Sequence, residues 1–145
     1  MITVLMGCPA AGKTTWMMKN KEGNEHIYST EAVRTNREMD VDRFMHHIRT
    51  KAALAASKGN SIIADGTHTM DIHRGFWLNV AKKYDHQTRL VVFDTALHVA
   101  LGFNSMRAYP APPKIVRDHW RRCQMAMRKI DREGWGSIEI IRRGY

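Results

Sequence analysis

The sequence begins MITVLMGCPAAGKTTW (residues 1–16), and the eight residues from Gly7 to Thr14 decide the fold. They match the pattern G-x-x-x-x-G-K-[ST], in which two glycines let the backbone wrap around a phosphate and the lysine reaches its terminal oxygens. The apolar run Ile2–Met6 precedes this loop and predicts a buried strand, and a helix-like stretch follows it. The N-terminus of that helix adds a positive dipole. The stretch therefore predicts a phosphate-binding loop (P-loop) that holds a nucleotide.

The P-loop also predicts individual roles and ligands. Lys13 is expected to bridge the terminal phosphates of the donor, which is ATP or another nucleoside triphosphate, and Thr14 is expected to ligate Mg²⁺. The residues predicted to bind the nucleotide are Gly7, Cys8, Pro9, Ala10, Ala11, Gly12, Lys13, Thr14 and Thr15.

Apolar runs alternate with helix-like stretches along the whole chain. The expected strands are 2–6, 26–28, 61–64, 89–93 and 137–141, and the expected helical stretches include 40–57, 71–84, about 95–107 and 113–133. Each crossover between parallel strands needs a covering helix, so the alternation predicts an α/β fold with three layers. We expect a P-loop NTPase fold, an approximately five-stranded parallel sheet with helices on both faces. With 145 residues, the chain is expected to form one domain, residues 1–145.

Composition limits the chemical class of partner and the type of cell compartment that we expect. Lys and Arg number 23 against 14 Asp and Glu, a formal charge of +9 that favours a polyanionic partner such as a nucleotide or nucleic acid. A generally basic, solvated surface explains the excess equally well. The two cysteines, Cys8 and Cys123, give no disulfide framework, so a reducing cytoplasm is expected. The N-terminal apolar run is too short to span a membrane, and no membrane contact is expected.

Charged residues follow the second and third strands, at the edge where ligands bind in open α/β sheets. Glu31 is placed to accept a hydroxyl proton, and Arg34, one helical turn later, is placed to hold an anionic part of the substrate. An ordinary surface ion pair between the two is the alternative. Asp65 is a candidate Mg²⁺ ligand together with Thr14, or else a helix cap. Arg74 is included with Arg34 as a substrate-binding arginine.

A proline-rich break, Tyr109-Pro110-Ala111-Pro112-Pro113, ends the helical stretch 95–107. We expect residues 103–113 to form a hinged lid. Arg107 lies just before the break and is placed to swing over the donor phosphates, where it would neutralise charge in the transition state. A basic residue that offsets the dipole at a helix end is the alternative.

With these elements taken together, the chain resembles the kinase domain of phage polynucleotide 5′-hydroxyl kinases of the T4 type. The P-loop and its flanks are similar to that family's G-C-P-x-x-G-K-[ST]-T-W pattern, with Thr15 and Trp16 included. Glu31-x-x-Arg34 resembles the family's D-x-x-R element. Residues 62–68 resemble its I-I-S-D-T-N strand end with one residue inserted, and residues 104–107 resemble its lid pattern N-S-x-R.

The resemblance implies a kinase that transfers the γ-phosphate of ATP, with Mg²⁺, to the 5′-hydroxyl end of DNA or RNA. It implies that Glu31 is the general base, that Arg34 binds the substrate's 3′-phosphate, and that Lys13 and Arg107 are catalytic. Glu31 is one methylene longer than the family's aspartate, and Phe103 stands where the family's lid has a further arginine. No D-x-D-x-T motif occurs, so the kinase reaction alone is implied.

Two other classes of function share these features. A small P-loop kinase of a mononucleotide, nucleoside, sugar or antibiotic would use the same loop, acid and lid. A nucleotide-binding module without transfer activity would keep the loop, and the absence of the lid arginine at Phe103 is compatible with it. A panel of acceptors separates these alternatives.

Overall fold

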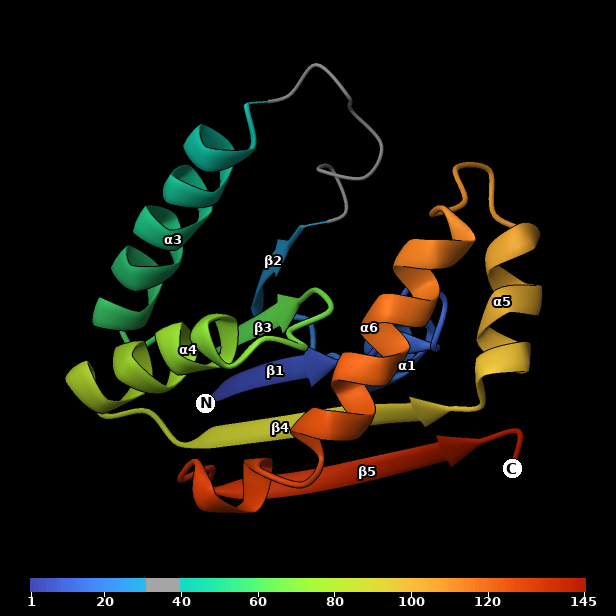
Figure 1. Ribbon diagram of the computed structural model, residues 1–145. Coiled ribbons are helices and arrows are strands. Elements are labelled where there is room, and N and C mark those ends of the chain that lie inside the picture. The colour runs from blue at the N-terminus through green and yellow to red at the C-terminus, as the bar shows by residue number, and fades with distance from the viewer. Residues whose placement is uncertain (31–39) are drawn as a thin grey trace.

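The computed structural model describes residues 1–30 and 40–145 (Figure 1). In chain order its elements are β1 (Ile2–Met6), α1 (Lys13–Asn20), β2 (His26–Ser29), α3 (Val41–Ser57), β3 (Ile62–Asp65), α4 (Asp71–Lys83), β4 (Thr88–Thr95), α5 (Leu97–Ser105), α6 (Pro113–Ala126), the 3₁₀ turn η1 (Ile130–Arg132) and β5 (Ser137–Arg143). Each predicted strand is present, and four of them continue for one or two residues beyond their predicted carboxyl ends.

The strands form one five-stranded parallel sheet in the order β2-β3-β1-β4-β5. Strand β1 is central and buried along its whole length, because neighbouring strands cover both its edges and helices cover both its faces. Side chains alternate across the sheet. Val4 and Met6 pack with α3, α4 and the second half of α6, whereas Leu5 packs on the other side with α1 and α5 (Figure 1). The predicted three-layer α/β fold is confirmed.

The helix boundaries follow local chemistry at two places. The side chain of Asp40 accepts a hydrogen bond of 3.1 Å from the backbone N–H of Arg43, so Asp40 is the N-cap of α3, as predicted. Pro113 occupies the first turn of α6, where its missing N–H leaves no hydrogen bond unmade. Among the described residues, no helix is long and apolar enough to cross a membrane.

Two predicted helices differ from the structure. The stretch 113–133 is divided, because α6 ends at Ala126 and the chain tightens into η1, which keeps Ile130 buried at 2% exposure. The stretch 95–107 begins its helix only at Leu97, because Thr95 still pairs with Arg143 in the sheet. In both cases the sequence pattern suited a longer helix, but tertiary contacts hold these residues in another conformation.

Candidate functional site

The P-loop after β1 and the carboxyl ends of β2, β3 and β5 lie at one large cavity of about 970 Å³. Its wall is formed by the P-loop, the ends of β2 and β3, one side of α3 and α4, and the connection from α5 to α6. Of the residues predicted to be catalytic or to bind metal, Lys13, Thr14, Asp65 and Arg107 all line it. The cavity lies at the carboxyl edge of the sheet, which is where open α/β sheets bind ligands.

The P-loop is held in place by the left-handed backbone conformation of Gly12 and by contacts with the core. Gly12 has φ 108°, in the left-handed region that favours glycine, and its backbone begins α1. The hydroxyl of Thr95, at the end of β4, donates a 2.8 Å hydrogen bond to the carbonyl of Ala11. Cys8 and Ala11 are almost fully buried, so these two residues anchor the loop while Pro9, Ala10, Gly12 and the first residues of α1 line the cavity.

Lys13 is the central cation of the loop. Its Nζ donates hydrogen bonds to the carbonyls of Gly7 at 2.9 Å and Cys8 at 2.7 Å. Burial lowers the pKa of Lys13 to about 8, and the nearby Cys8 and Asp65 offset this in part, whereas Arg107 adds to it. Burial makes this ammonium easier to deprotonate. A phosphate oxygen in place of the two carbonyls would bring a negative charge that stabilises the protonated form.

This pKa predicts a pH dependence of donor binding. The ammonium form of Lys13 binds phosphate, and its population falls as pH rises through about 8. We expect the Kd for MgATP to be constant below about pH 7 and to rise by up to about tenfold per pH unit above the pKa. Titration calorimetry from about pH 6.5 to 9.5 measures this. Lys13→Arg, whose guanidinium stays charged, is the control and should show no such rise; an equal rise in both proteins would contradict the assignment to Lys13.

Thr14 and Asp65 supply oxygen ligands that fit Mg²⁺. Both line the cavity, and Asp65, the last residue of β3, is only 7% exposed. The Ser29 hydroxyl donates a 3.1 Å hydrogen bond to Oδ2 of Asp65, which holds the carboxylate in place. Within residues 1–30 and 40–145, no group of three His, Cys, Asp or Glu side chains could hold a metal without help. Mg²⁺ commonly takes one or two protein oxygens and completes its shell with phosphates and water, which suits this pair.

The end of the cavity near β2, α3 and α4 is aromatic, a feature that the sequence reasoning missed. This aromatic recess is lined by Tyr28, Met45, Ile48, Arg49, His73, Phe76 and Trp77. The rings of Phe76 and Trp77 meet edge to face with their centroids 4.9 Å apart, and the Arg49 guanidinium lies 5.6 Å from the Phe76 centroid. Residues 71–84 were expected to form a helix, but the sequence gave no indication of which rings would face a ligand.

His68 holds Trp77, one of the rings of this recess, in place. It is 8% exposed, its Nδ1–H donates to the Leu5 carbonyl at 2.7 Å, and its Nε2 accepts a hydrogen bond from the Trp77 indole at 3.1 Å. Burial lowers the pKa of His68 to about 4, so the ring is neutral near pH 7. His68 therefore fixes Trp77 against the end of β1 and serves the architecture of the site.

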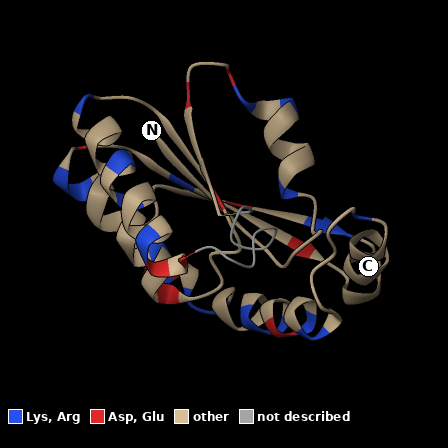
Figure 2. Ribbon diagram, turned by 90° about the horizontal axis from the view of Figure 1, so that it is seen from above, with Lys and Arg blue, Asp and Glu red and all other residues tan. Residues whose placement is uncertain are grey.

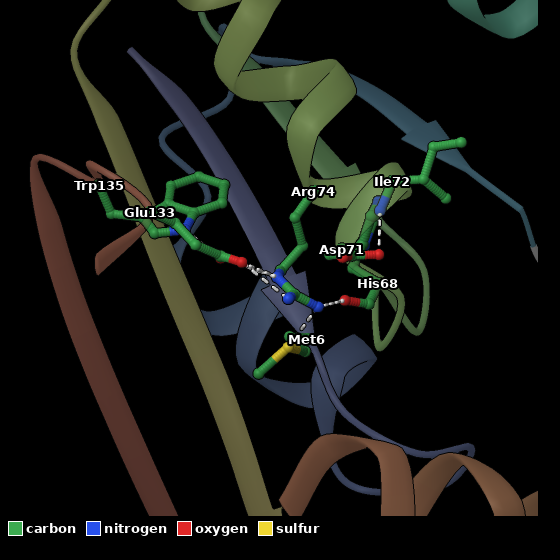
Figure 3. Close-up of polar contacts among 7 residues, drawn as sticks. All are labelled: Met6, His68, Asp71, Ile72, Arg74, Glu133 and Trp135. Atoms are coloured by element: carbon green, nitrogen blue, oxygen red, sulfur yellow. Dashed lines mark hydrogen bonds and ion pairs between the residues drawn. The ribbon is translucent and has the colours of Figure 1, made fainter. Parts of the chain in front are cut away.

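The structure corrects the assignment of Arg74 to substrate binding. Its side chain is 1% exposed and does not line the cavity. As Figure 3 shows, Nε and Nη2 donate to the Glu133 carboxylate, with a shortest distance of 2.8 Å, and Nη1 donates to the His68 carbonyl at 3.0 Å. Arg74 is an internal arginine that joins α4 to the turn after α6. Its charge is balanced by Glu133 beneath the site, so the guanidinium is not available to a substrate.

The segment predicted to be a lid joins α5 to α6 above the P-loop. Phe103, Arg107 and Pro112 line the cavity. Asn104 is buried and exchanges two hydrogen bonds with the backbone of Ala111, at 2.8 and 3.0 Å, which ties the two ends of the connection together. Whether residues 103–113 close over a ligand stays a prediction, and the position of Arg107 on the cavity wall is compatible with it.

His119, on α6, is a cavity residue that the sequence reasoning did not select. Its Nδ1 shares a 2.8 Å hydrogen bond with the Thr69 hydroxyl. Burial, followed by the charges of Arg122 and Lys13, lowers the pKa of His119.

Glu31 and Arg34 lie outside the described residues, so their predicted roles as base and substrate ligand stay predictions. The chain before them, Ser29 and Thr30, forms part of the cavity wall.

Residues 2–130 match the AAA_33 family model, which describes an AAA domain. Among the curated proteins, none matches the sequence. A crystal structure of a candidate kinase from Chloroflexus aurantiacus J-10-fl aligns with a TM-score of 0.71 and 15% identity, over 97% of this chain and 84% of that one.

Two further solved structures are similar at low identity. Deoxyadenosine kinase from M. mycoides, with its products dCMP and dCDP, aligns with a TM-score of 0.54 and 12% identity over 97% of this chain and 90% of that one. The AvrRxo1-ORF1:AvrRxo1-ORF2 complex with ATP aligns with a TM-score of 0.66 and 16% identity over 90% of this chain, which spans about half, 49%, of that one. The family match and the shared fold lead to one conclusion. The chain belongs to the AAA_33 family of AAA domains, and its fold is that of the P-loop kinases.

Proposed function

We propose that the protein transfers the γ-phosphate of ATP to the 5′-hydroxyl end of DNA or RNA. The observation that carries the proposal is the shape of the cavity, which runs from Lys13 in the P-loop to the aromatic recess around Tyr28 and Phe76. Bases stack on aromatic rings and on guanidinium groups, and the recess offers both, with Arg49 beside Phe76. A terminal nucleoside with its base in the recess would have its 5′-hydroxyl between the recess and the donor phosphates.

In this proposal each residue has a defined task. The P-loop amides and Lys13 hold the donor phosphates, and Arg107 offsets charge that develops on the migrating group. The 5′-oxygen forms a bond to the γ-phosphorus, the bond from that phosphorus to ADP breaks, and the hydroxyl proton passes to Glu31. Arg34 orients the acceptor strand. Mg²⁺ held by Thr14 and Asp65 would supply charge neutralisation at the phosphates.

The net charge of +9 suits a polyanionic acceptor but does not by itself identify one. Figure 2 shows Lys and Arg on several of the helices, so the basic residues are not confined to one element. The acceptor is therefore argued from the cavity and from the resemblance in sequence, and the charge adds a general attraction that should weaken with salt.

Phosphate transfer from γ-labelled ATP to an oligonucleotide tests the proposal. A 5′-hydroxyl oligonucleotide should be labelled, and the same oligonucleotide with a 5′-phosphate should not. Glu31→Gln should lower the rate by about 10²- to 10⁴-fold, the range for loss of a general base, without changing the Kd for MgATP. Labelling that does not depend on the 5′-hydroxyl would overturn the acceptor, and an unchanged rate in Glu31→Gln would overturn the base.

A small-molecule kinase is the second candidate, and the size of the cavity favours it. About 970 Å³ lies within the usual range for small-molecule sites, and the aromatic recess would accept a single nucleoside as readily as the end of a strand. Free nucleosides, mononucleotides, sugars and aminoglycosides in the same assay separate the two candidates. A kcat/KM for one of these above that for the oligonucleotide would favour the small acceptor, and ATP binding without transfer to any acceptor would favour a module that only binds nucleotide.

A further inference from the structure

Arg143, the last residue of β5, brings a cation to the P-loop from the far end of the chain. Its backbone is fixed, because its carbonyl accepts a 2.9 Å hydrogen bond from the Ala96 N–H, and Thr95 is its partner in the sheet. Alternation along β5 sends neighbouring side chains to opposite faces. Arg142 pairs with Asp94 at 3.4 Å on one face, whereas Ile141, two residues before Arg143, packs with the P-loop side of the sheet.

The guanidinium of Arg143 lies against Gly12. A Cβ on Gly12 would stand 3.3 Å from Nη1 and 3.5 Å from Cζ of Arg143, so the guanidinium lies directly beside the backbone of Gly12, at the place where a side chain would begin. Arg143 also lines the same cavity as Lys13, Thr14 and Thr15. A second cation therefore stands beside the loop that wraps the phosphates.

Among the residues that the structure describes, none forms a hydrogen bond or an ion pair with the Arg143 side chain. The acid on the neighbouring strand, Asp94, is already engaged by Arg142, by the Gln124 amide at 2.7 Å and by the Tyr145 hydroxyl at 2.7 Å. A guanidinium that faces a phosphate-binding loop and has no acidic partner in residues 1–30 and 40–145 is a suitable partner for a phosphate oxygen, since its fork of N–H donors matches that group.

We infer that Arg143 is a second cation of the donor site and contacts the phosphate chain of the bound nucleoside triphosphate. The inference rests on the proposed function only for its donor, and it holds for any acceptor. It also gives β5 a role in the site, although no motif in residues 137–145 indicated one.

Binding measured without any acceptor tests this inference. We expect Arg143→Ala to raise the Kd for MgATP and the Kd for inorganic tripolyphosphate by about tenfold each in titration calorimetry. Arg143→Lys should retain part of the affinity, because it keeps the charge but loses the fork. Arg142→Ala, whose side chain points to the other face, is the matched control and should stay within about twofold. Circular dichroism melts verify that the variants are folded.

Two outcomes would overturn the inference. The first is a Kd for both probes in Arg143→Ala within about twofold of the unaltered protein. The second is weaker binding of MgATP with unchanged binding of tripolyphosphate, which would place the contact at the nucleoside instead of the phosphates. Neither result bears on the acceptor, because a failure of the polynucleotide proposal appears only in the transfer assay.

Discussion

Replacement of Lys13 with alanine is expected to lower the rate of phosphate transfer by about 10³-fold while the protein stays folded. The loss follows because the ammonium lies in the loop that wraps the phosphates and its charge is needed most as charge migrates in the transition state. The fold should survive, since among the described residues Nζ donates hydrogen bonds to the carbonyls of Gly7 and Cys8 alone, and its burial already disfavours the charged form. The rate is measured with γ-labelled ATP and the 5′-hydroxyl oligonucleotide, and folding by thermal melting.

Lys19 provides the control for this experiment. It lies on the same helix, α1, but is exposed and does not line the cavity, so Lys19→Ala should transfer phosphate at the original rate. If Lys13→Ala remains within tenfold of the unaltered protein, the P-loop does not hold the transferred phosphate, and the assignment of the donor site is wrong.

The second large effect is on stability. Replacement of Arg74 with methionine should lower the free energy of unfolding by about 3 kcal/mol, because removal of one partner leaves the other charge of a largely buried pair uncompensated. The guanidinium is 1% exposed, and the Glu133 side chain is 18% exposed. The substitution also leaves the His68 carbonyl without the donor that reached it at 3.0 Å. Urea denaturation of the two proteins measures the difference.

Arg121 is the matched control for Arg74. It lies 3.9 Å from Asp118, but its side chain is 72% exposed, so Arg121→Met should change the free energy of unfolding by less than about 0.5 kcal/mol. The double variant Arg74→Met with Glu133→Gln should recover part of the loss, since it removes both charges. An Arg74→Met midpoint that shifts no more than that of Arg121→Met would contradict the structural role.

The same pair predicts how the difference varies with pH. Burial raises the pKa of Glu133, but hydrogen bonds from Arg74 and Trp135 outweigh burial and lower it overall. The stabilisation by the pair is therefore complete above the unfolded glutamate value of about 4.3 and is lost as the pH falls through the lower folded value. The gap between the unaltered protein and Arg74→Met should narrow in acid below about pH 4.

Local signals were enough to predict most of the fold. Buried strands such as Ile2–Met6 show as short apolar runs, and their alternation with helices requires parallel crossovers. The P-loop is a continuous stretch, so its pattern could be recognised without the rest of the chain. Asp40 likewise caps α3 through a contact with a residue three positions away. These features depend on interactions between residues that are close in sequence.

Contacts between distant residues decided the rest of the site. Arg74 looks from the sequence like an arginine available to a substrate, yet the packing of α4 against the turn after α6 pairs it with Glu133. The aromatic recess exists because β2, α3 and α4 bring Tyr28 and Phe76 to one cavity. Arg143 reaches Gly12 only because β5 lies beside β4 and ends next to the P-loop. The sequence by itself determined the P-loop, because its glycines, lysine and threonine stand at fixed spacings within eight residues. The ion pair of Arg74 and the aromatic recess were decided by the tertiary structure, because they form only when the sheet brings distant segments together.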